Sequence, residues 1–175
     1  MLNRRHLIAG LSAAAAPFAS RAQAPVKIVF VDTGNTGRSL MAEVLGRAEA
    51  ARRKLPVALI SRGLDPVPFD EAAEPNARVL LAARGFDVAA HRARRLDLAD
   101  IAHADLILTM TAGHAEKVVA LAPGAGGKVF TLARYATGAD EPVPDAWGKP
   151  MAAYEAVVAQ LDRLIPPALT KATGA

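Results

Sequence analysis

The chain has 175 residues and a mass of 18.2 kDa, with 52% hydrophobic and 22% charged residues. This composition excludes a disordered chain, and the length favours one globular domain. There is no cysteine, which excludes disulfides, thiolate metal sites and a cysteine nucleophile. The formal net charge is +4, but Arg4, Arg5 and Arg21 contribute three positive charges to the first 24 residues. Residues 25–175 are therefore nearly neutral, and no nucleic-acid partner is expected.

The first 24 residues have the pattern of an export signal. A charged start is followed by a short apolar stretch at 7–18 and by the small residues Ala22 and Ala24. The pair Arg4-Arg5 resembles a twin-arginine signal, which predicts export of a folded protein to the periplasm. Because the apolar stretch is too short to span a bilayer, no stable membrane insertion is expected after cleavage. An uncleaved anchor and a misassigned start are the alternatives.

From Pro25 onward, β-branched runs alternate with segments of helical composition and with loops rich in Gly and Pro. In chain order, the pattern first predicts a strand at 26–31, a loop at 32–39, a helix at 40–53 and a strand at 57–60. It then predicts a helix at 76–84 that Gly85 ends, a short helix at 98–102, a strand at 105–109 and a helix at 112–121 with Thr111 as its N-cap. The last predicted elements are a strand at 128–132, a long loop at 133–149 and a helix at 151–164 closed by Pro166 and Pro167.

This alternation predicts an α/β fold, a three-layer sandwich with a four-stranded parallel sheet between helices. We expect the domain to span residues 25–166 and residues 167–175 to form a frayed tail. In such sheets, ligands bind beyond the carboxyl ends of the strands. The loop after the first strand is therefore the expected position of a binding site.

The loop after the first strand has the features of a phosphate-binding loop. Gly34 and Gly37 allow a tight turn that directs backbone N–H groups inward. The loop leads into the N-terminus of a helix, which favours an anion, and Arg38 can bind two phosphate oxygens at once. The predicted phosphate-binding residues are Thr33, Gly34, Asn35, Thr36, Gly37, Arg38 and Ser39.

The segment Val31–Glu43 resembles the signature of the low-molecular-weight protein-tyrosine phosphatases. Thr36 is similar to the residue that the protein-arginine phosphatase branch of this family carries in the loop. The resemblance covers residues 26–164. Its other matching segments are Ser61–Gly63, Gly85–Asp87, His91–Leu96, Asp105–Met110 and Val143–Gly148.

The resemblance implies the phosphatase fold and a role for each matching residue. Arg38 would bind phosphate, Asn35 would hold the loop in its strained shape, and Ser39 would hydrogen-bond the nucleophile position. Asp145 would be the general acid that protonates the leaving group, and Trp147 would form a wall of the substrate slot. The family implies no cofactor, and its ligand would be phosphate or a phosphorylated molecule.

The chain departs from the family at the residues that carry the chemistry. The family has its nucleophilic cysteine at Asp32 and commonly a second cysteine at Gly37. The family's prolines after the loop serine and after the acid are Leu40 and Ala146 here. Arsenate reduction, which relatives of this fold perform, needs redox cysteines and is excluded.

Two readings of Asp32 follow. In the first, its carboxylate attacks phosphorus and forms an acyl phosphate, with Arg38 and Asp145 completing the catalytic set. In the second, the carboxylate occupies the anion pocket, where its charge costs an incoming phosphate on the order of several kcal/mol. We favour the second reading, a catalytically impaired pseudophosphatase with a binding or regulatory role toward a protein partner. An active phosphomonoesterase with Asp32 as nucleophile is the alternative.

The histidines give no indication of a metal site. His91, His103 and His114 lack the close spacing of metal ligands, and His91 matches a structural position of the family. No metal is therefore expected.

Overall fold

The computed structural model describes residues 24–175, so the predicted signal, apart from Ala24, lies outside the described residues. Four parallel strands form one sheet in the order β2-β1-β3-β4. Each strand is a short run of mostly β-branched or aliphatic residues, as expected for a sheet covered on both faces. The strands are β1 (Val26–Asp32), β2 (Val57–Gly63), β3 (Leu106–Thr109) and β4 (Val129–Thr131).

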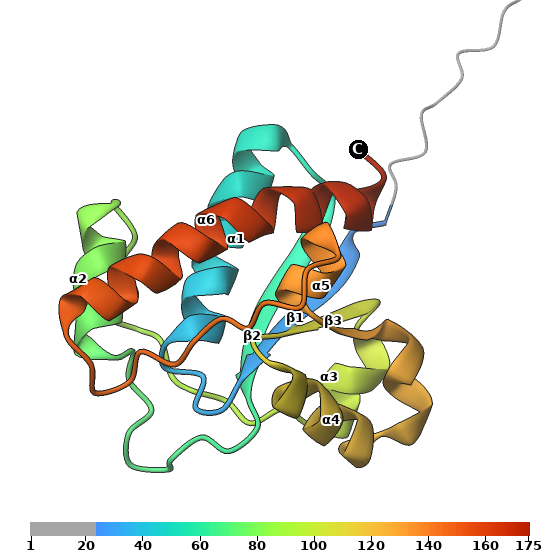
Figure 1. Cartoon of the computed structure of the whole chain (residues 1–175), viewed down its shortest axis with the longest axis horizontal. Coiled ribbons are helices and arrows are strands. Elements are labelled where there is room, and N and C mark those ends of the chain that lie inside the picture. The colour runs from blue at the N-terminus through green and yellow to red at the C-terminus, as the bar shows by residue number, and fades with distance from the viewer. Residues whose placement is uncertain (1–23) are drawn as a thin grey trace, which may run out of the picture.

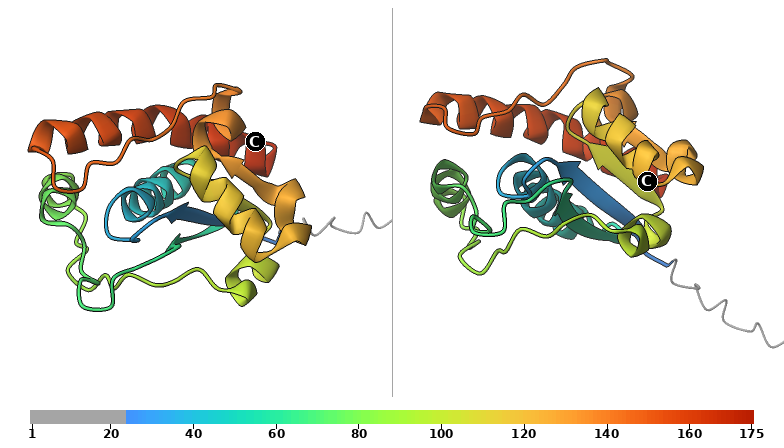
Figure 2. Two further views of the ribbon diagram at one scale, coloured as in Figure 1. Left: turned by 60° about the horizontal axis from the view of Figure 1, so that its bottom comes forward. Right: turned by 90° about the horizontal axis from the view of Figure 1, so that it is seen from below.

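Helices cover both faces of this sheet and confirm the predicted α/β sandwich (Figures 1 and 2). The long helices α1 and α6 pack against each other on one face, with α2 and α5 beside α6. Helices α3 and α4 lie on the opposite face. The helices are α1 (Arg38–Arg53), α2 (Pro75–Ala83), α3 (Leu98–His103), α4 (Ala112–Leu121), the 3₁₀ helix η1 (Pro123–Lys128), α5 (Leu132–Thr137) and α6 (Met151–Thr173).

The central strand β1 divides the core into two parts. Ile28 and Phe30 face the larger cluster, which contains the buried residues of α1 and α6. Val29 and Val31 face the smaller cluster under α3 and α4. This alternation follows from the two-residue period of a strand. All four side chains are buried, so β1 is held on both faces and its carboxyl end is a fixed platform for the following loop.

Two segments differ from the sequence-based expectation. The loop expected at 133–149 contains α5, because the Thr131 side chain accepts a hydrogen bond from the Arg134 N–H and Gly138 ends the helix at φ +80°. The frayed tail expected at 167–175 was wrong, since α6 passes through both prolines to Thr173. Proline at 166 and 167 removes two helix donors, but Ala168 and Leu169 are fully buried against the core. The stabilisation from burying these side chains therefore outweighs the cost of the two prolines inside the helix.

Among residues 24–175, no helix combines the length and apolar character needed to cross a membrane.

The final turns of α6 should contribute to stability as part of the core. Leu169→Ala is expected to lower the free energy of unfolding by about 2–5 kcal/mol, because it leaves a cavity at a fully buried position. The exposed Glu155→Ala on the same helix should change it by less than about 0.5 kcal/mol. Urea unfolding of both variants checks this. Equal stability of the two would show that the segment after the prolines does not pack.

Candidate active site

Asp32 is the last residue of β1 and is 2% exposed. Gly63, at the end of β2, lies in register with Asp32, and the loop that follows Asp32 passes close to it. A Cβ atom at position 63 would lie 2.8 Å from the carbonyl oxygen of Thr33. Only glycine at 63 lets the loop approach the sheet this closely. The glycine of the Ser61–Gly63 segment thus fixes where the loop rests.

The carboxylate of Asp32 accepts backbone hydrogen bonds from the middle and from the end of the loop. The N–H of Asn35 donates to Oδ1 over 2.6 Å, and the N–H of Ser39 donates to Oδ2 over 2.9 Å. Both bonds are buried and charge-assisted, which makes them stronger than bonds between neutral groups. The loop is therefore wound around the side chain of its own first residue.

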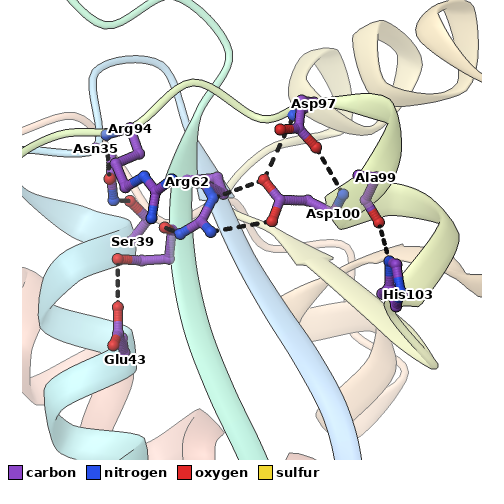
Figure 3. A network of polar contacts seen from close by, with 10 residues as sticks. Asn35, Ser39, Glu43, Arg62, Arg94, Asp97, Ala99, Asp100 and His103 are labelled. Carbon is purple, nitrogen blue, oxygen red and sulfur yellow. Dashed lines mark hydrogen bonds and ion pairs between the residues drawn. The ribbon is translucent and has the colours of Figure 1, made fainter.

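Asn35 holds the shape of the loop. Its φ is +59°, a left-handed conformation that asparagine tolerates better than most residues. Its side chain donates to Ser39 Oγ over 3.0 Å and accepts from the backbone N–H of Arg94 over 2.9 Å (Figure 3). Its carbonyl oxygen lies 2.6 Å from Nε2 of His91. Asn35 thus ties the loop to the segment around Arg94.

Arg38 begins α1, and its side chain is only 7% exposed. One guanidinium nitrogen donates to the carbonyl oxygen of Val143 over 3.2 Å. The other lies 3.2 Å from the carboxylate of Asp145, which is 59% exposed. The structure thus brings together Asp32, Arg38 and Asp145, the three residues of the predicted catalytic set, from β1, α1 and the loop before α6.

A pocket of about 270 Å³ opens beside the loop. Trp147 contributes to its wall but remains 66% exposed. Carboxylates outnumber the single arginine in the lining. The lining residues are Asp32, Thr33, Gly34, Thr36, Arg38, Asp65, Val67, Asp70, Glu74, Asp145 and Trp147. Asp65 forms an ion pair with Arg95 over 2.7 Å. The pocket is thus unusually acidic for an anion site.

Glu74, at the N-cap of α2, is a member of the site that the sequence reasoning missed. It lies far from the loop in sequence, and no motif marks it. Its carboxylate accepts from Thr36 Oγ1 over 3.0 Å and from the Tyr154 hydroxyl. Burial raises the pKa of Glu74, and the charges of Asp32 and Asp145 raise it further.

Two of the three histidines in the described part of the chain, His91 and His114, contact the loop. Nε2 of the buried His114 lies 3.0 Å from Thr33 Oγ1, and burial together with the nearby Arg38 lowers the pKa of His114. Thr111 caps the same helix by accepting from the His114 N–H, as predicted. Within residues 24–175, no three His, Asp or Glu side chains are grouped so that they could hold a metal ion.

The left-handed conformation of Asn35 gives a stability prediction. Asn35→Ala and Asn35→Gly lose the same side-chain hydrogen bonds, but glycine has no steric cost at φ +59°. The glycine variant should therefore be more stable in urea by about 1 kcal/mol. At Asn76, which is helical in α2, the order should reverse. An alanine variant at 35 as stable as the glycine variant would contradict the strained loop.

Comparison with known proteins agrees with this geometry. The family model for low molecular weight phosphotyrosine protein phosphatase matches residues 27–172. A protein-arginine-phosphatase of Geobacillus stearothermophilus is 37% identical over 142 residues, covering 81% of this chain and 92% of the relative.

Two solved structures are similar to this chain. A mutant of YwlE from Bacillus subtilis has a TM-score of 0.79 at 32% identity, covering 83% of this chain and 97% of that one. The YwlE arginine phosphatase with serine in place of its cysteine, phosphorylated on the active-site serine, has the same TM-score and identity and covers 83% and 94%. The chain described here belongs to the low-molecular-weight phosphotyrosine protein phosphatase family, near its arginine phosphatase branch.

Proposed function

We propose that this protein is an exported, catalytically impaired member of the phosphatase family, with a binding or regulatory role. The observation that carries the proposal is the pair of hydrogen bonds from the N–H groups of Asn35 and Ser39 to Asp32. A loop of this kind binds phosphate through inward N–H groups. Here two of those donors serve a resident carboxylate, whose charge repels a phosphate placed in the loop.

The surroundings of Arg38 support the same conclusion. Its guanidinium contacts the carbonyl of Val143 and the carboxylate of Asp145. A phosphate ligand would have to compete with these acceptors, or share the guanidinium with them. The acidic lining of the pocket adds to the repulsion. Phosphate or a phosphorylated ligand is therefore expected to bind only weakly.

A binding role is supported by the apolar surface next to the pocket. Trp147 is 66% exposed, and Phe69 is 92% exposed between the pocket-lining residues Val67 and Asp70. Exposed aromatic side chains next to a concave site are typical of surfaces that contact protein partners. We propose a protein partner for this surface.

An active phosphatase is the second candidate, because one observation on a relative favours it. In the similar YwlE structure, a serine in place of the cysteine carries a phosphoryl group, so an oxygen nucleophile can accept phosphorus in that protein. In this chain, a carboxylate oxygen of Asp32 would attack phosphorus. The bond from phosphorus to the leaving oxygen would break, and Asp145 would protonate that oxygen. Water would then hydrolyse the acyl phosphate.

Turnover of an aryl phosphate separates the two candidates. The wild-type protein is expected to be inert, with and without Mg²⁺. Asp32→Cys should gain measurable turnover, because it restores the family's nucleophile in a loop that keeps Arg38 beside Asp145. Release of the phenol, followed by absorbance, checks this.

Asp32→Asn is the matched control, because it removes the charge and keeps the shape of the side chain. Wild-type turnover that disappears in Asp32→Asn would make Asp32 a working nucleophile and would replace our proposal by the second candidate.

Export is the remaining part of the proposal, and the pattern of residues 1–24 supports it. Residues 1–24 fused to a folded reporter are expected to deliver it to the periplasmic fraction of a bacterium with twin-arginine transport. Substituting lysine for both Arg4 and Arg5 should strongly reduce this delivery, because the twin-arginine pair is the recognised feature. Fractionation and immunoblotting provide the measurement. A reporter that stays in the cytoplasm with the unaltered segment would contradict export.

A further inference from the structure

Glu74 is held against the phosphate loop by contacts from three directions. Its backbone N–H donates to the carbonyl of Thr36 over 3.0 Å, and its carboxylate accepts from Thr36 Oγ1 over 3.0 Å. The Tyr154 hydroxyl of α6 donates to the other carboxylate oxygen. Because the backbone and both carboxylate oxygens are engaged, the side chain is fixed rather than free to turn into solvent.

The position of this carboxylate depends on the glycine at 37. A Cβ atom at Gly37 would lie 2.6 Å from Oε1 of Glu74 and 3.0 Å from its Cδ. The family commonly has a cysteine at this loop position, as stated above. In this chain the carboxylate occupies the space that such a side chain would need. A negative group therefore stands directly against the backbone of the loop.

The charges around Glu74 are mostly of its own sign. The negative charges of Asp32 and Asp145 both raise the pKa of Glu74, and Asp65 and Asp70 line the same pocket. Arg38 is the only basic residue in that lining, and it already faces Asp145. An anion entering the pocket would therefore meet Glu74 as well as Asp32.

We propose that Glu74 is a second specificity-determining residue of this pocket, which together with Asp32 excludes tetrahedral anions such as phosphate and sulfate. The inference rests on the proposed function, because it concerns the same loop. It adds that a protein without the charge of Asp32 still binds anions more weakly than a protein that lacks the charges of both Asp32 and Glu74.

The charge of Glu74 makes this exclusion dependent on pH. Burial raises the pKa of Glu74 above its ordinary value of 4.5, so the side chain begins to gain a proton at higher pH than a free glutamate. Protonation removes the negative charge. Anion binding should therefore strengthen as the pH falls through this raised pKa and weaken above it.

Sulfate is a suitable probe, because it stays a dianion throughout the pH range in which a carboxylic acid with a raised pKa gains its proton. Calorimetric titration with sulfate would use the full chain as Asp32→Ser, as Asp32→Ser with Glu74→Gln, and as Asp32→Ser with Glu116→Gln. Serine at the active site is accommodated in the similar YwlE structure. Glu116 lies exposed on α4, so its substitution removes the same charge away from the pocket.

At about pH 8, adding Glu74→Gln is expected to strengthen sulfate binding about tenfold relative to Asp32→Ser alone. The gain should shrink as the pH falls through the raised pKa of Glu74, because Glu74 then gains a proton in the single variant. Glu116→Gln should leave the affinity nearly unchanged. If Glu74→Gln does not fold, the pH dependence of Asp32→Ser itself still tests the claim, because its affinity for sulfate should rise as the pH falls through the raised pKa of Glu74.

Equal affinities for sulfate with and without Glu74→Gln, no binding by either protein, or the same gain from Glu116→Gln would each overturn the inference. These results differ from a failure of the proposed function, which would appear as turnover of an aryl phosphate by the wild-type protein.

Discussion

The site is organised by one interaction, the pair of backbone hydrogen bonds that Asn35 and Ser39 donate to the carboxylate of Asp32. In a loop built to surround an anion, the first residue of the loop supplies the anion itself. The same contacts that would stabilise a phosphate now stabilise the folded loop. The shape of the loop is therefore stabilised by a carboxylate of the loop itself.

Much of the fold was predictable, because its signals are local. Each of these signals depends only on residues a few positions apart in the sequence. They are the β-branched runs of β1 and β3, the glycine-rich loop and the Thr111 cap. The extension of α6 was not predictable. It depends on burial of Ala168 and Leu169, which no local rule for proline contains.

The candidate site divides in the same way. Arg38 and the loop residues follow from one continuous segment, and Asp145 with Trp147 followed from resemblance to a family. Glu74 had no such signal, since its neighbours Thr36 and Tyr154 belong to a different loop and a different helix. Its place in the site follows only from these tertiary contacts.

The close approach of the Glu74 carboxylate to Gly37 also restricts which side chains position 37 can carry. A cysteine returning to position 37 would meet the Glu74 carboxylate before it could fit, because a Cβ atom there already lies 2.6 Å from Oε1. Any side chain at position 37 therefore requires the carboxylate of Glu74 to move. The residue at position 37 and the conformation of Glu74 are thus coupled, so the effects of substitutions at the two positions on stability are not expected to add.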